Sequence, residues 1–367
     1  MNEPTRRQIF AVSFVALLSP ATRLVPGAAA RAASHAAWLC PIAAAPFCVL
    51  AAALVTRFLR GRRAGEGLGE TLAGALPRLG RAVLLLYGLW LALYTGFSLR
   101  SAASRFIYTI YTGSSPWSFV AVGLAVSLAA ALGSVKQLAR TAEIFRALLL
   151  LVIVPVLALG LAQLDWAELL PVSYLDAPGV LLGAAETFGT VCFALVNAPF
   201  LETGTPEPGR GKAAGLWSVK ACLFLTALTA SVIGRFGPEL SGELTYPFFA
   251  LVRNTGLFGV AERIEAFVTA LWVLSDFVLC ALTLMASERC LSLALKPRPR
   301  PDAPRLLRPG TLLTLASALT ALACALVIAP DSRTMRIFSD KIVVAVNLAM
   351  LALMFLTMTI SILRKKQ

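Results

Sequence analysis

The chain has 367 residues, of which 58% are hydrophobic and 14% charged, and its mean hydropathy is +0.78. This composition excludes an ordinary soluble domain and predicts an all-α polytopic membrane protein. On a soluble protein, the net charge of +14 would indicate a nucleic-acid partner. Here the cations lie in short gaps beside apolar spans, so we expect membrane lipids and no nucleic acid as partners.

Runs of about 20 apolar residues predict ten transmembrane helices. In chain order they are expected at 8–28, 36–57, 82–107, 116–134, 144–164, 178–201, 213–235, 262–288, 311–329 and 340–363. The sixth and seventh are joined by Leu201–Lys212, whose prolines and glycine indicate a turn. We expect the ten helices to form a single integral-membrane domain that spans residues 1–367.

The Lys and Arg residues are concentrated in alternate gaps between the apolar spans. The gap before Tyr87 and the segment Arg289–Arg308 are rich in cations, whereas Asp165–Pro178 has none. Cationic loops of membrane proteins stay in the cytoplasm, so we expect both chain ends, including Arg364-Lys365-Lys366, on the cytoplasmic side. The acidic loop Asp165–Asp176 is then expected on the outer side.

Cysteine and histidine give no sign of a metal site. The seven cysteines lie in or beside apolar spans without a C-x-x-C motif, and His35 is the only histidine. The cysteines are expected to pack as small apolar side chains, and we expect no metal and no cofactor. Because the sequence shows no pairing of a nucleophile with a base, we do not expect an enzyme.

Two spans are interrupted by small and helix-breaking residues at corresponding places. The first contains Ser19–Gly27 with two prolines, and the sixth runs from Gly183 through Asn197-Ala198-Pro199. They are the first and sixth of ten, which suggests a five-plus-five repeat, with repeat one at about 8–164 and repeat two at about 178–363. Unwound backbone at such places offers N–H and C=O groups to a solute. The alternative is that these residues only bend their helices.

Acidic residues deep in two spans are candidates for ligand or proton contact. Glu186 lies in the sixth span and Asp276 in the eighth. A charge at mid-membrane is costly, so each is expected to face protein or water, and a structural hydrogen bond is the alternative role. Polar stripes follow one face of the eighth span (Glu262, Glu265, Thr269, Trp272 and Asp276) and of the third (Tyr87, Tyr94, Ser98, Ser101 and Arg105). An ion pair of Arg100 or Arg105 with Glu262 or Glu265 is one hypothesis.

Short motifs along nearly the whole chain resemble the spore germination permease family. They are Arg7-Gln8-Ile9-Phe10, His35-Ala36-Ala37-Trp38, Leu99-Arg100, Arg140-Thr141-Ala142-Glu143, Leu170-Pro171-Val172, Glu262-Arg263-Ile264-Glu265 and Trp272-Val273-Leu274-Ser275-Asp276-Phe277. That family comprises the B subunits of germinant receptors and belongs to the amino acid–polyamine–organocation transporter superfamily. The resemblance implies two inverted five-helix repeats in the LeuT-like fold of amino-acid permeases.

The resemblance also implies a location, partners and a ligand. The location is the spore inner membrane or cell membrane, beside A-type and C-type receptor subunits, and the ligand is a small nutrient such as an amino acid. The expected pocket, with the two deep acids included, is lined by Ser19, Ala21, Thr22, Tyr94, Ser98, Glu186, Thr187, Gly189, Thr190, Trp272, Ser275 and Asp276.

Two other functions remain open on the sequence. One is a secondary transporter of amino acids or related solutes, driven by protons or sodium, in which Glu186 or Asp276 would be the coupling group. The other is a membrane scaffold that binds no ligand and only assembles the receptor.

Overall fold

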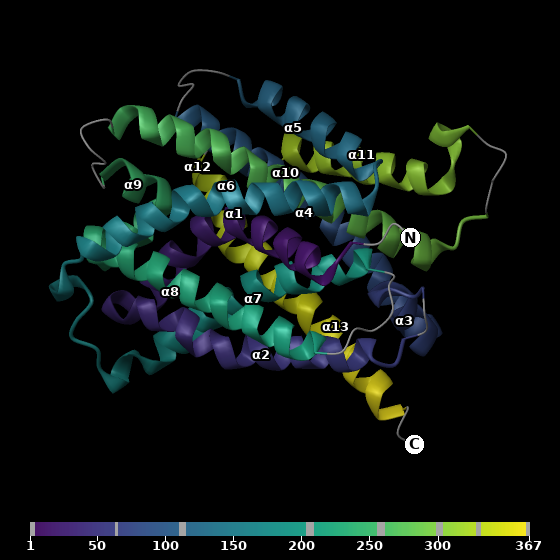
Figure 1. Cartoon of the computed structure of the whole chain (residues 1–367), viewed down its shortest axis with the longest axis horizontal. Helices are drawn as coiled ribbons and strands as arrows, with labels where there is room; N and C mark the ends of the chain where they lie inside the picture. Colours follow the sequence, from purple (N-terminus) through teal and green to yellow (C-terminus); the bar gives the residue numbers. More distant parts are fainter. Residues whose placement is uncertain are drawn as a thin grey trace.

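The computed structural model describes residues 4–62, 65–109, 115–202, 209–254, 261–298, 304–327 and 332–364, with backbone only for some residues beside the gaps. The described residues form helices and turns, with no strand among them (Figure 1). The long helices are α1 (Arg6–Ala33), α2 (Cys40–Leu59), α4 (Pro77–Thr109), α5 (Pro116–Ala131), α6 (Val135–Ala162), α7 (Ala177–Asn197), α8 (Arg210–Glu243), α10 (Ala261–Leu295), α11 (Pro309–Val327) and α13 (Val344–Arg364). They correspond one to one with the ten predicted spans.

Length and hydropathy support a membrane-spanning bundle. Within the residues that the structure describes, eight helical segments are long and apolar enough to cross a membrane, and the first, Arg6–Leu59, contains both α1 and α2. The apolar α5 is shorter, at 16 residues. The described part of the chain also contains three short α-helices, α3 (Leu68–Ala75), α9 (Pro247–Asn254) and α12 (Ser332–Ile337), and several 3₁₀ turns. A π-helical segment, Phe338–Val343, leads from α12 into α13.

Several helices extend beyond their predicted ends because caps and kinks, rather than hydropathy, set the boundaries. Helix α6 begins nine residues earlier than predicted, where the side chains of Ser134 and Gln137 form a capping box. Helix α8 continues to Glu243 across a kink at Gly237, whose φ of 72° favours glycine, followed by Pro238. The polar first turns of α6 add no hydropathy, so the apolar run alone could not reveal them.

Helices α4 and α10 run antiparallel and are joined by polar contacts at several levels. The hydroxyls of Thr95 and Thr283 lie 2.7 Å apart, and Ser287 Oγ donates to the carbonyl of Gly88 at 2.7 Å. Further along the same pair, Arg105 forms an ion pair with Asp276. These bonds fix the register of α4 against α10, because each buried hydroxyl needs its own partner.

Helix α1 lies in the middle of the bundle, in contact with α6, α7, α8 and α10. Figure 1 shows the start of α1, the end of α13 and α3 at one end of the bundle, and α9 at the opposite end. Nearly all of α1 from Val12 to Ala30 is buried, which agrees with a helix surrounded by protein rather than lipid. The residues of its predicted break therefore lie inside the protein.

The predicted unwinding of the first and sixth spans is wrong for the described backbone. Helix α1 is continuous through Pro20 and Pro26, and α7 is continuous until Asn197, where Pro199 begins a short 3₁₀ turn. The prolines remove single N–H donors, but the surrounding helices hold the chain in helical geometry.

Close helix packing makes Gly96 of α4 sensitive to substitution. An added Cβ would collide with the carbonyl oxygen of Ala321 on α11, a backbone atom that cannot turn aside. Helix propensity alone favours Ala over Gly by about 1 kcal/mol. We expect Gly96→Ala nevertheless to lower the thermal midpoint, whereas Gly215→Ala on α8, where the nearest atom is Val49 Cγ1 at 3.7 Å, should leave it unchanged or raise it. If Gly96→Ala and Gly215→Ala had the same thermal midpoint, the close contact between Gly96 and α11 would be contradicted.

Candidate ligand-binding site

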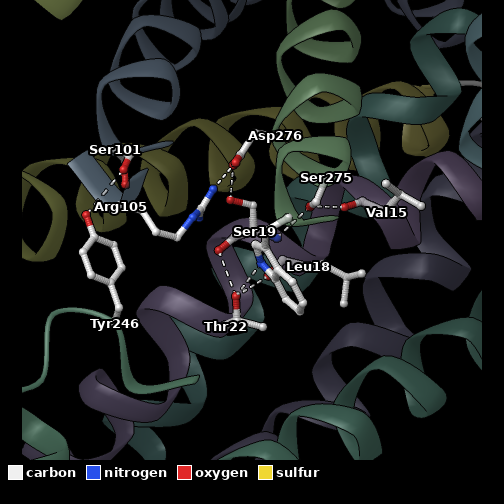
Figure 2. Close-up of polar contacts among 10 residues, drawn as sticks. Val15, Leu18, Ser19, Thr22, Ser101, Arg105, Tyr246, Ser275 and Asp276 are labelled. Atoms are coloured by element: carbon white, nitrogen blue, oxygen red, sulfur yellow. Dashed lines mark hydrogen bonds and ion pairs between the residues drawn. The ribbon is translucent and has the colours of Figure 1, made fainter. Parts of the chain in front are cut away.

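The buried carboxylate of Asp276 on α10 joins three helices. Its Oδ1 accepts a hydrogen bond from Ser19 Oγ on α1, and its Oδ2 forms an ion pair with Arg105 of α4 (Figure 2). The side chains of Arg105 and Asp276 are 1% and 7% exposed. Ionised groups are rarely buried so deeply unless they are paired, and here each supplies the opposite charge that the other needs.

The neighbouring residue, Ser275, enters the hydrogen-bond ladder of α1. Its Oγ accepts from the backbone N–H of Ser19 at 3.0 Å and donates to the carbonyl of Val15 at 2.6 Å. Val15 and Ser19 are i and i+4 partners, so the hydroxyl bridges two groups that an undisturbed helix would pair directly. Helix α1 is thus linked to α10 through its backbone, one residue before Pro20.

Trp272, one turn from Asp276, is fully buried and connects α10 to α1 and α9. Its Nε1 donates to Thr22 Oγ1 at 3.2 Å, and that hydroxyl donates to the carbonyl of Leu18 at 2.8 Å. The indole lies 4.6 Å from the ring of Phe248 and 5.6 Å from that of Phe249. Such aromatic pairs contribute about 0.5–1.5 kcal/mol beyond their buried area.

Helix α9 covers the Arg105 side of this cluster. The guanidinium carbon of Arg105 lies 5.3 Å from the centre of the Phe249 ring, a cation–π contact. The hydroxyl of Tyr246, at the start of α9, donates to the carbonyl of Ser101 on α4 at 3.4 Å (Figure 2). The short helix α9 is therefore attached both to the ion pair and to the helix that carries its cation.

A second aromatic group links Tyr94 to α1 and α7. The Tyr94 ring lies 4.5 Å from Phe193 of α7 and 6.2 Å from Phe97. Arg23 of α1 lies over Phe97 at 4.8 Å, and its Nη1 donates to Ser339 Oγ at 3.0 Å. The predicted pocket residue Ser98 is buried on the same helix.

A lateral cavity reaches the ion pair from between α4, α5 and α10. Its volume is about 350 Å³, and apolar residues such as Phe106, Phe119 and Phe277 line most of it. Asp276 is the acidic residue in its lining. The carboxylate therefore lies at the boundary between the buried cluster and a space large enough for a small molecule.

The structure brings together Ser19, Thr22, Trp272, Ser275 and Asp276 from the predicted set. Ala21 is buried in the hydrophobic core between them.

The predicted residues of α7 make different contacts. Gly183 packs against Cys40, and an added Cβ at Gly189 would contact Leu348 of α13. The hydroxyls of Thr187 and Thr190 donate to the carbonyls of Gly183 and Glu186 within their own helix. Glu186 is half-buried. Among the described contacts, none joins these α7 residues to Asp276, so their place in a pocket stays a prediction.

The structure adds Arg105, Phe248, Phe249 and Tyr246 to the candidate site. The sequence placed Arg105 in the polar stripe of its span and in a possible ion pair with Glu262 or Glu265, but not in the pocket. The side chains of Glu262 and Glu265, the hypothetical partners of Arg105, lie outside the described residues. The described acidic partner of Arg105 is Asp276.

Comparisons with known proteins agree with this architecture. The chain resembles MhsT, solved in complex with L-phenylalanine, with a TM-score of 0.60 and 12% identity over 96% of this chain and 89% of MhsT. It also resembles the inward-facing conformation of Mhp1, with a TM-score of 0.59 and 15% identity over 96% of this chain and 78% of Mhp1. Both have the LeuT fold. No curated protein matches the sequence.

A family model described as spore germination protein matches residues 5–333, which is most of the chain. The structural likeness independently establishes the fold. The chain therefore belongs to the spore germination permease family and is an integral-membrane permease with the LeuT fold.

Proposed function

We propose that this chain is the membrane subunit of a spore germinant receptor and that it recognises a small zwitterion, an amino acid, at the Arg105–Asp276 pair. The observation that carries the proposal is one buried cation and one buried anion on different helices, with the hydroxyl of Ser19 on a third. The structure of MhsT was solved with L-phenylalanine, which supports this ligand class.

A zwitterion is suited to this site because it carries both charges that the pair requires. Its carboxylate would bind the Arg105 guanidinium. Its ammonium would bind Asp276 and replace Ser19 Oγ as a hydrogen-bond donor to that carboxylate. Every buried charge would then keep an opposite charge, whereas a ligand with a single charge would leave one protein group unpaired. Leaving a buried charge unpaired costs about 3–5 kcal/mol, which favours the zwitterion over its amine or acid analogue.

Insertion of the ligand would separate α4 from α10 and change the position of α1. The apolar side chain of an amino acid would occupy the lateral cavity that Asp276 borders. A ligand shifts a conformational equilibrium only by its differential affinity for the two states. Here that difference would come from exchanging the Arg105–Asp276 contact for two contacts with the ligand, and the change would pass to the A-type and C-type subunits.

The test is a binding series on the purified chain in lipid nanodiscs. Each member of an amino-acid panel is compared with the amine that lacks its carboxylate and with the acid that lacks its amino group. We expect at least one amino acid to raise the thermal midpoint, since a ligand at a hundred times its Kd stabilises by about 2.7 kcal/mol. Its two analogues should give no shift. Equal shifts from an analogue would contradict recognition of a zwitterion at this pair.

The second candidate function is gradient-driven transport, which the transporter fold favours. Proteoliposomes that contain only this chain would be given the amino acid found above, with a proton or sodium gradient. If the chain senses rather than transports, we expect binding without sustained accumulation. Accumulation that collapses when the gradient is dissipated would instead establish the transporter. Loss of the germination response to that amino acid in spores that lack the gene would support the receptor.

A further inference from the structure

The strongest feature outside the candidate site is a groove between α1, α6 and α8 on the half of the bundle where all three helices begin. Its volume is about 930 Å³, and four of its lining residues are cations: Arg6, Arg7, Arg146 and Lys220. None of its lining residues is acidic. We call this feature the basic groove.

Two of these cations lie beside the apolar parts of their helices. Lys220 is ten residues after Arg210 at the start of α8, or about 15 Å along the helix, with apolar residues on both sides. Arg146 of α6 follows the polar first turns of that helix and directly precedes its long apolar run. Lys220 is exposed and Arg146 is half-buried. A cation on a lipid-facing surface at such depth is costly unless an anion or water reaches it.

The walls of the basic groove are apolar and aromatic. Phe10 of α1 stacks on Trp217 of α8 with ring centres 6.4 Å apart, and Phe14 contacts Phe224 edge to face at 6.0 Å. Leu150 of α6 and Leu216 of α8 also line the groove. The groove therefore combines cations with apolar and aromatic walls.

This combination is complementary to one amphiphile, an anionic phospholipid of the surrounding membrane. A soluble anion would match the cations and leave the apolar walls without a partner, whereas a neutral lipid would match the apolar walls alone. Arg7 forms an ion pair of 3.1 Å with Glu143 of α6, so its charge is already partly neutralised and contributes less to binding an anion. Basic pockets between transmembrane helices are a known type of binding site for anionic lipid headgroups.

We propose that the basic groove binds one anionic phospholipid, with its phosphate at Arg146 and Lys220 and its acyl chains along the apolar lining further from the helix starts, at Phe14, Leu150 and Phe224. The bound lipid contacts the first turns of α1 and thereby fixes the start of this central helix against α6 and α8. This site is separate from the Arg105–Asp276 pair, so the proposal does not depend on the identity of the nutrient.

The experiment measures thermal unfolding of the delipidated full-length chain in detergent during titration with phosphatidylglycerol or phosphatidylcholine. Phosphatidylglycerol is expected to raise the midpoint at far lower concentration than phosphatidylcholine. In the variant Arg146→Gln/Lys220→Gln, the phosphatidylglycerol concentration for half-maximal stabilisation should rise about 30-fold, which corresponds to about 1 kcal/mol for each cation.

The matched control is Arg57→Gln/Arg60→Gln, which removes two exposed cations at the end of α2, outside the groove, and should keep the wild-type titration. The midpoint in phosphatidylcholine verifies that each variant is folded. The proposal is overturned if both lipids act alike on the wild type, or if the groove variant keeps the wild-type preference. It is also overturned if soluble glycerol phosphate stabilises as well as the lipid does.

Discussion

Replacement of Arg105 by Met is expected to lower the free energy of unfolding by about 3–5 kcal/mol, because it leaves the buried carboxylate of Asp276 without its cation. The reciprocal change, Asp276→Leu, should have an effect of similar size, since the guanidinium would then be the unpaired charge. Reversible unfolding in mixed micelles of mild and denaturing detergent measures both effects. Arg57→Met removes an exposed cation of α2 and should change stability by less than about 0.5 kcal/mol.

The double variant Arg105→Met/Asp276→Leu separates a structural role from recognition. Apolar residues in place of a whole buried ion pair are often neutral or stabilising, so we expect the double variant to recover most of the stability that each single variant loses. It should nevertheless fail to bind the amino acid, because no charge remains for either end of a zwitterion. A double variant that is as unstable as the two single losses added together would show that the groups act independently. A stable double variant that still binds the ligand would remove the pair from the site.

The number and order of the long helices were largely predictable because they depend on local properties of the chain. Apolar length indicates a span, and the ten predicted spans all correspond to helices. Helix ends were less predictable. The start of α6 depends on the Ser134–Gln137 capping box and the end of α8 on the Gly237 kink, and neither feature changes the mean hydropathy of its surroundings.

Only some of the residues that surround the Arg105–Asp276 pair could be predicted, for a different physical reason. Polar or aromatic residues at an interrupted or polar part of an apolar span could be identified from the sequence: Ser19, Thr22, Trp272, Ser275 and Asp276. Helical periodicity shows which residues share a face, but the partner across the interface depends on the register of two helices. The register of α4 against α10 makes Asp276 the described partner of Arg105. The register of α1 against α10 places Ser275 in the hydrogen-bond ladder of α1.

Removal of the Trp272 side chain is the second change for which we expect a large effect. The indole is fully buried, contacts Phe248 and Phe249 of α9, and donates to Thr22 of α1. Trp272→Ala would leave a cavity between the three helices and should lower the free energy of unfolding by about 3–5 kcal/mol. Because α9 packs on Arg105 through Phe249, the same change should also weaken ligand binding.

Two milder variants distinguish the hydrogen bond of Trp272 from its packing. Thr22→Val keeps the shape of the side chain but removes the acceptor, and hydrogen bonds between membrane helices average about 0.6 kcal/mol, so the expected loss is small. Trp272→Phe keeps an aromatic ring against α9 and should lose less stability than Trp272→Ala. If Thr22→Val were as damaging as Trp272→Ala, the hydrogen bond rather than the aromatic packing would hold α9 and α1 to α10. We expect Trp272→Ala to be far less stable than Trp272→Phe and Thr22→Val. That order would show that aromatic packing connects α9 to the buried ion pair.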